Sequence, residues 1–264
     1  MESDNTHAIA MMSRDVSESA SEDSSESEPD AFESLYERLQ YSMSTSVFER
    51  TQGSRFLPRD AFEKVLSSTA AGPSDRRNFV LEVMGVELSR PSEDDRALAD
   101  YILDSARKVF LVAVDIELEQ LHAAMKLFKI SQYKDEDLPV EEYSRTRLKV
   151  ALRQNHHPFQ RMETVQRKLR GQDEEKNRRR IWSLPTIARF QDSQWIFLAP
   201  TMSTLDLNSN FDHRCPIPFI TKDSRQSSGS YGIVYKYTIH HAHFKNTFHQ
   251  VIQIMAHAGL GFAG

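Results

Sequence analysis

Two glycines spaced three residues apart mark the stretch of this sequence whose residue types and spacing could do chemistry. Gly229 and Gly232 flank the pair Ser230 and Tyr231, and Val234 follows two residues later. Glycine has no Cβ atom, so its backbone can turn tightly and come close to a ligand. The pattern therefore predicts a β-hairpin whose backbone N–H groups could approach phosphate oxygens.

The same residues resemble the glycine-rich loop of protein kinases, which follows the pattern Gly-x-Gly-x-x-Gly-x-Val. Gly229, Gly232 and Val234 stand at its second glycine, third glycine and valine, and Ser227 stands at the position of the first glycine. The resemblance implies ATP as the cofactor, with the loop backbone closing over its phosphates. It implies the nucleotide-binding residues Ser227, Gly229, Ser230, Tyr231, Gly232 and Val234.

The flanking sequence resembles a family of fungal proteins in which a long helical region precedes a protein-kinase domain. Three stretches carry this resemblance: Trp-Ile-Phe-Leu-Ala-Pro at 195–200, Ile-Pro-Phe at 217–219 and Val-Tyr-Lys-Tyr-Thr-Ile-His at 234–240. It is most specific over 194–243, a minority of the chain. It implies that residues 186–264 are the first strands of a kinase N-lobe.

A working kinase needs further residues that this sequence does not supply. They are a lysine on the third strand, an aspartate in the catalytic loop and the metal-binding Asp-Phe-Gly. The lysine would fall within 246–254, which contains none; Lys245 comes too early, and strand alternation places Lys236 toward solvent. We therefore expect a truncated kinase-like protein with no catalytic residues and no phosphoryl transfer.

The alternative is a helical protein-interaction module that acts as an adaptor without enzymatic activity. A module that stands alone should have a closed core. An incomplete N-lobe should instead leave unpaired strand edges and exposed apolar surface from Trp195 onward. How well these residues are buried therefore separates the two interpretations.

Histidine and cysteine residues offer little further chemistry. His240, His241 and His243 would lie on or just after a strand, where adjacent side chains point to opposite faces, and no carboxylate lies near them in the sequence. We expect a solvated strand end and no metal site. The single cysteine, Cys215, excludes an intramolecular disulfide and favours a reducing compartment.

Composition limits the partners of the chain. The 264 residues carry a net charge of −5, which gives no overall attraction to nucleic acid or acidic membranes. A run of about eighteen apolar residues is missing, and so is a basic segment followed by an apolar one at the N-terminus. We expect an intracellular protein, cytoplasmic or nuclear, with no membrane contact and a protein partner bound by its helical part; the oligomeric state is open.

The elements that must position the hairpin fall into four predicted regions. Residues 1–30 are acidic and serine-rich with little to bury, which predicts a disordered tail. Residues 31–160 should form a helical accessory domain, 161–185 a charged linker, and 186–264 the partial kinase N-lobe. Two basic clusters between Arg167 and Arg180 fit either a bipartite nuclear-import signal or a plain solvated linker.

Hydrophobic spacing predicts the helices of the accessory domain. Apolar residues recur at three- and four-residue intervals, and the longest such run, 97–113, should be one central helix. Further helices are expected at 32–39 with Asp30 as cap, 58–66, 76–83 and 140–154. Residues 116–130 should either continue the central helix with a bend or form a second helix after a short break.

The residue composition after Pro185, with short apolar runs separated by turn residues, predicts strands. Residues 187–190 and 195–198 should form a hairpin, 216–220 an extended edge element, and 231–239 the last strand. The predicted fold class is therefore α+β, mainly helical in its N-terminal part and followed by a few antiparallel strands.

Overall fold

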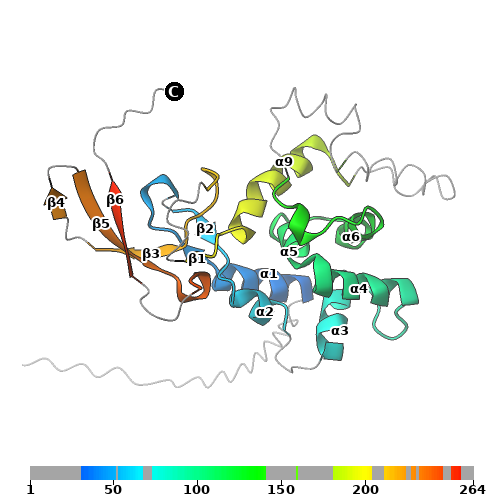
Figure 1. The fold of residues 1–264 in the computed structure, drawn as a ribbon. Coiled ribbons are helices and arrows are strands. Elements are labelled where there is room, and N and C mark those ends of the chain that lie inside the picture. The colour runs from blue at the N-terminus through cyan, green and yellow to red at the C-terminus, as the bar shows by residue number, and fades with distance from the viewer. Residues whose placement is uncertain are drawn as a thin grey trace, which may run out of the picture.

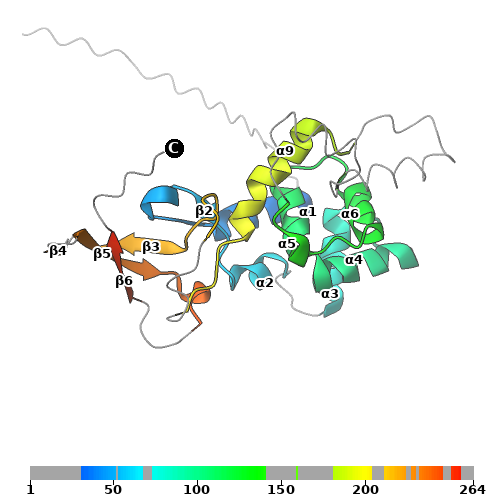
Figure 2. The ribbon, with the colours of Figure 1, turned by 45° about the horizontal axis from the view of Figure 1, so that its top comes forward.

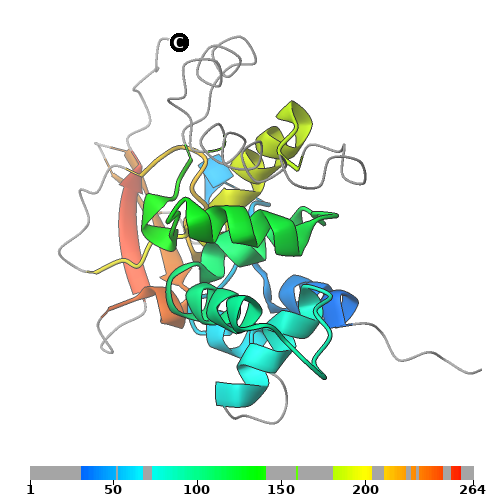
Figure 3. The same cartoon turned by 90° about the vertical axis from the view of Figure 1, so that its right-hand side faces the viewer.

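A computed structural model describes residues 31–51, 53–67, 73–140, 159, 181–203, 211–223, 227–229, 232–245 and 251–256. Their fold is α+β, as predicted, with a mainly helical part followed by the larger antiparallel sheet and a short two-stranded sheet between the first two helices (Figure 1). The sheet lies at one side of the helices (Figure 2, Figure 3). The acidic tail, the predicted helix 140–154 and most of the charged linker lie outside the described residues.

The helical part buries one continuous apolar core. Its helices are α1 (Ala31–Ser42), α2 (Ala61–Val65), α3 (Pro73–Val83), α4 (Glu93–Ser105), α5 (Arg107–Asp115), α6 (Leu121–Ile130) and α9 (Leu184–Ser193). Leu35 and Leu39 of α1 are fully buried, as their four-residue spacing predicts. The predicted helices at 58–66 and 76–83 correspond to α2, which is shorter, and to α3.

Helix α5 forms the centre of this core. The six residues from Val109 to Val114 are all 0% exposed, so the helix is apolar on every side. It contacts α1, α4, α6 and α9. Each large side chain buried here stabilises the fold by about 1.5–3 kcal/mol relative to exposure.

The predicted continuous helix over 97–113 is wrong, because the structure divides it at Ala106. This residue has φ −134° and ψ 33°, outside the helical region, and α5 starts directly after it. An Asp135 carboxylate oxygen accepts the Val109 N–H at 3.1 Å, so a distant side chain satisfies part of the new helix N-terminus. A contact far along the chain therefore supports a break that periodicity does not reveal.

The start of α4 is a conventional cap that also ties two helices together. The Ser92 hydroxyl accepts the Asp95 N–H at 3.1 Å and donates to the Asp95 carboxylate at 2.6 Å. The other Asp95 oxygen lies 2.8 Å from Nε2 of His122 and 3.1 Å from Nζ of Lys126, both on α6. The Ser92 hydrogen bond is the largest cause that lowers the pKa of Asp95 well below its usual range.

The predicted hairpin over 187–198 is also wrong, because these residues form α9 and a short 3-10 helix, η3 (Gln194–Phe197). Ser183 caps α9 by accepting the Thr186 N–H at 3.2 Å. Ile187 and Phe190 then recur at helical spacing and are buried in the helical core. Residues assigned to the partial N-lobe by sequence thus pack with the helices instead.

The buried amide of Gln194 holds the turn after α9 in place. Its side chain donates to the carbonyl of Val140 at 3.0 Å and accepts the Val140 N–H at 2.6 Å. It also donates to the Gln191 carbonyl at 2.9 Å. A fully buried amide is tolerated because its donors and acceptor are paired.

The larger sheet is antiparallel, with β5 in its middle. Its strands are β3 (Phe219–Lys222), β4 (Ser227–Gly229), β5 (Gly232–Ile239) and β6 (Val251–Ala256). Residue 234 pairs with 227 on one side and with 255 on the other, so β4 and β6 flank β5. The predicted strand 231–239 is confirmed as β5. The edge element predicted at 216–220 overlaps β3 only at Phe219 and Ile220, and β6 was not predicted.

An N-terminal hairpin connects the helices with the sheet. It consists of β1 (Ser44–Thr45) and β2 (Arg55–Phe56), with the 3-10 helix η1 (Glu49–Thr51) between them. The Val47 N–H donates to the carbonyl of Phe219 on β3 at 2.8 Å. The buried Ser46 hydroxyl donates to the Ile217 carbonyl at 2.6 Å. Residues about 170 positions apart therefore share a small second core.

Candidate functional site

The glycine hairpin predicted from the sequence is present. Strands β4 and β5 pair with Ser227 opposite Val234 and Gly229 opposite Gly232. Both glycines therefore lie at the end of the ladder next to the turn. Ser230 and Tyr231, the two remaining predicted binding residues, lie outside the described residues.

The strand next to the hairpin carries no lysine. Strand β6 has the sequence Val-Ile-Gln-Ile-Met-Ala, and its Gln253 pairs with Lys236 of β5. Lys236 is exposed, which confirms the prediction from strand alternation. A second lysine of the sheet, Lys222, lies 2.6 Å from the Glu49 carboxylate and 3.8 Å from the centre of the Tyr235 ring. Both lysines thus have structural or solvent-facing positions.

The described residues from Trp195 onward do not show the broad exposed apolar surface expected of an incomplete lobe. Trp195, Phe219 and Ile239 are at most 7% exposed. Within the described part of this region, Ile220 is the large apolar side chain that reaches 36% exposure. The side chains of this region whose burial is described are therefore mostly packed, and those of residues 227–234 and of β6 lie outside this description.

The histidines after β5 do not form a solvated strand end. His241 and His243 lie on a 3-10 turn, η4 (His241–His243), and His243 is only 3% exposed. The Nδ1–H of His243 donates to the Pro200 carbonyl at 2.9 Å, and its Nε2 accepts the Arg59 N–H at 3.2 Å. Burial lowers the pKa of His243, which favours the neutral ring that both hydrogen bonds require.

The same turn meets a carboxylate that no sequence signal placed there. Nε2 of His241 lies 3.4 Å from a carboxylate oxygen of Asp60, at the start of α2. The His240 ring stacks on the His241 ring with centroids 4.5 Å apart. Asp60 is about 180 residues away along the chain, so only tertiary folding creates this group.

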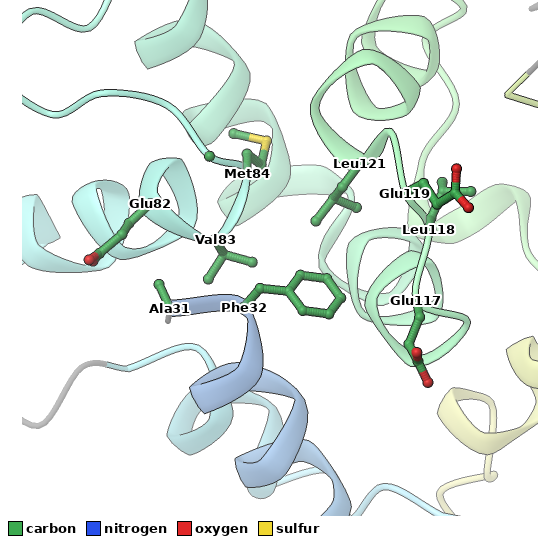
Figure 4. A pocket seen from close by; sticks show the side chains of 10 residues that line it. Ala31, Phe32, Glu82, Val83, Met84, Glu117, Leu118, Glu119 and Leu121 are labelled. Carbon is green, nitrogen blue, oxygen red and sulfur yellow. The ribbon is translucent and has the colours of Figure 1, made fainter. Parts of the chain in front are cut away.

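A groove with an apolar floor opens in the helical part, as Figure 4 shows. Its volume is about 680 Å³. The half-buried Phe32 ring points into the space between Val83 and Leu121. The lining residues are Ala31, Phe32, Glu82, Val83, Met84, Gly85, Glu117, Leu118, Glu119 and Leu121.

The rim of this groove is acidic and contains one unusual backbone conformation. Glu82, Glu117 and Glu119 are exposed around the apolar floor. Glu117 has φ 50°, in the left-handed region that favours glycine. Gly85, with φ 72°, holds the equivalent position after α3 on the other side of the groove. A glutamate at this position has a small backbone cost relative to glycine.

The hydrogen bonds around Glu117 define its position in the helix ending. The Glu117 N–H donates to the Val114 carbonyl, and the Leu118 N–H donates to the Ala113 carbonyl at 3.1 Å. Together these two hydrogen bonds form a Schellman motif at the end of α5. Gln132, with φ 54°, repeats this geometry at the end of α6 and does not line the groove. The chain thus offers a matched position for experiments on Glu117.

A second cavity, of about 410 Å³, has mixed charge. Arg59, Arg107 and Lys108 line it together with Glu63 and Asp135. Arg107 is paired with Glu63, and burial lowers the pKa of Lys108 while Asp135 opposes that shift. The mixed lining gives this cavity no clear preference for an anion or a cation.

No family model, curated protein or solved structure matches this chain. The resemblance to fungal kinase-domain proteins therefore stays a prediction from the sequence. Among the residues that the structure describes, no helix is both long and apolar enough to cross a membrane.

Proposed function

We propose that this chain is a kinase-like protein without catalytic activity, whose glycine hairpin faces the phosphates of a nucleotide. The pairing of Gly229 with Gly232 is the observation that supports this proposal most directly. Two glycines opposite each other at the turn leave no Cβ atom between the backbone and a phosphate. Strand β6 beside β5 extends the hairpin into three successive antiparallel segments.

The same sheet supports the absence of phosphoryl transfer. Transfer requires a lysine that holds the α- and β-phosphates and acidic residues that bind magnesium and orient the substrate. Strand β6 has Gln253 and no lysine, and the sequence has neither the catalytic-loop motif nor Asp-Phe-Gly. The hairpin alone would contact phosphates without activating them.

Nucleotide binding by the full chain tests this proposal. We expect saturable binding of a fluorescent ATP analogue with Mg²⁺, weakened at least about tenfold by Gly229→Glu or Gly232→Glu, because a carboxylate there repels phosphate. The control Lys236→Ala, on the exposed face of β5, should bind like the wild type. Absence of binding by the folded wild-type chain would refute the nucleotide assignment, and phosphoryl transfer would refute the non-catalytic one.

A second function, adaptor binding through the groove of the helical part, is favoured by the apolar floor and acidic rim. Phe32, Val83 and Leu121 can contact one apolar side chain of a partner, and the rim glutamates attract basic residues on either side of it. The partner that fits is a peptide segment with an apolar anchor between lysine or arginine residues. Such recognition needs no catalytic group.

Substitutions at the two matched helix endings test the adaptor proposal. Glu117→Gly and Gln132→Gly should each stabilise the protein by about 0.5–1 kcal/mol, because glycine relieves the left-handed conformation. Only Glu117→Gly should weaken binding of a basic peptide selected against the full chain from a random library. Equal peptide affinity of the two variants, or selection of peptides without basic residues, would count against this function.

A further inference from the structure

Among the described residues, Asp60, His240 and His241 form a group of three potential metal ligands outside the hairpin and the groove. One ligand atom from each lies within 4.8 Å of the other two. Asp60 comes from the start of α2, and the histidines come from the end of β5 and the turn after it. We propose that these three residues bind a divalent transition-metal ion, with Zn²⁺ as the best fit.

The distance between His241 and Asp60 already suits a tetrahedral ion. Two ligands of one Zn²⁺ ion, each about 2.0–2.1 Å from the metal, lie about 3.4 Å apart. Nε2 of His241 and the nearer Asp60 oxygen are already 3.4 Å apart. The His241 side chain is 62% exposed, so its ring can turn toward the ion without disturbing the core. Two imidazoles and one carboxylate favour zinc and its neighbours over magnesium or calcium.

The surrounding contacts hold the ligands in place. The buried His243 ring accepts the Arg59 N–H, directly before Asp60, and so ties this segment to the histidine turn. The Phe56 ring packs edge-on against His240, with centroids 6.1 Å apart, and the His240 N–H donates to the Pro218 carbonyl at 2.8 Å. The backbone at Asp60 and at His240 is therefore held in place by contacts that need no metal ion.

One ring nitrogen of His240 has a hydrogen-bond partner in the metal-free fold. Its Nδ1 accepts the Ala242 N–H at 3.3 Å, and a neutral imidazole has a single nitrogen with a lone pair, so an ion has to displace this contact. A hydrogen bond of this length is weak, so an ion can replace it.

One competitor for the site is weak. Nζ of Lys64 lies 3.2 Å from the Asp60 carboxylate, and its side chain is 73% exposed. Exposed ion pairs of this kind contribute little to stability, so an ion can displace the ammonium group. With three protein ligands, the fourth position would hold water or a group from a partner.

Metal binding by the untagged full chain tests this site, because a polyhistidine tag would itself bind Zn²⁺. Competition with a fluorescent chelator should give one Zn²⁺ per chain, and Co²⁺ should give the intense visible absorption of a tetrahedral site. His241→Asn and Asp60→Asn should each weaken Zn²⁺ binding at least about tenfold. Zn²⁺ should raise the melting temperature of the wild type but not of these variants.

A matched control separates this site from adventitious surface binding. His213 lies 3.4 Å from the Asp212 carboxylate and is 81% exposed, so it repeats the histidine–aspartate pair alone. His213→Asn should leave Zn²⁺ binding unchanged. Equal loss in His213→Asn and His241→Asn, or no binding by the folded wild type at micromolar Zn²⁺, would overturn the proposal. Metal-free melting curves of each variant show whether it has folded, independently of nucleotide and peptide binding.

Discussion

The helical core and the sheet core are built by different kinds of contact. The helical core joins segments that are mostly neighbours in the sequence, and it surrounds the fully buried α5. Among the residues whose burial is described, five are buried in the sheet core, and Val47 and Phe48 from the N-terminal hairpin pack against them. The larger core can therefore form from local patterns, whereas the smaller one requires two distant parts of the chain to meet.

The largest expected effect is the loss of a side chain at the centre of the helical core. Phe110→Ala should lower the free energy of unfolding by about 3–5 kcal/mol, because Phe110 is 0% exposed and lies in α5. Urea unfolding followed by circular dichroism measures this. The control Tyr41→Ala, at a residue 89% exposed on α1, should change stability by less than about 0.5 kcal/mol. Similar losses in both variants would contradict the central place of α5.

The corresponding change in the sheet core should be smaller and local. Phe219 stacks on Tyr237 with centroids 4.9 Å apart and meets Phe48 edge-on at 5.5 Å. Phe219→Ala should lower the free energy of unfolding by about 3 kcal/mol, the lower end for such a change, because the described part of the sheet core is smaller than the helical core. Hydrogen exchange should accelerate in β3 and β5 and stay slow in α5. Equal acceleration in both regions would show that the two cores unfold as one unit.

Removal of one hydroxyl group should weaken the contact between the N-terminal hairpin and the sheet. Ser46 is 1% exposed, donates to the Ile217 carbonyl at 2.6 Å and lies 3.0 Å from the Thr51 hydroxyl. Ser46→Ala should lower the free energy of unfolding by about 1–3 kcal/mol, because the buried Ile217 carbonyl and Thr51 hydroxyl each lose a hydrogen-bond partner. A double-mutant cycle with Thr51→Val measures the coupling within this pair. Additive effects of the two substitutions would rule out a shared network.

The smallest effect concerns the pH dependence of the helical part. The pKa of Asp95 is lowered in the folded protein, mainly by Ser92 and then by His122 and Lys126. Its stabilising contribution is therefore complete above the unfolded pKa of about 3.9 and is lost as the pH falls toward the folded value. Asp95→Asn should lower the free energy of unfolding by about 1 kcal/mol at pH 7 and should leave it unchanged at a pH where the Asp95 carboxylate is protonated in the folded protein. A difference that stays constant from pH 7 down to pH 2 would contradict this account.

Comparison of predicted and observed elements shows where sequence patterns suffice. The apolar faces of α1 and α6 follow from three- and four-residue spacing, because a helix presents such residues on one side. The hairpin at Gly229 and Gly232 follows from local turn chemistry. The error at 187–198 arose because short apolar runs fit a strand or a buried helix equally well.

The candidate sites divide in the same way. The hairpin residues were found from their spacing, whereas neither Asp60 beside His241 nor the groove under Phe32 has a signal in the sequence. Asp60 follows Arg59, and the Arg59 N–H donates to the buried His243 ring, which brings Asp60 close to the histidine turn. No pattern within a short window could report a contact of this separation.

By itself, the sequence determined the α+β class, the apolar helix faces, the glycine hairpin and the outward position of Lys236, because each depends on residues within a few positions of one another. Only the tertiary structure decided the break at Ala106, the helical state of α9 and the meeting of Asp60 with the histidine turn. Each of these depends on packing or hydrogen bonds between distant segments, and such contacts can override local preference.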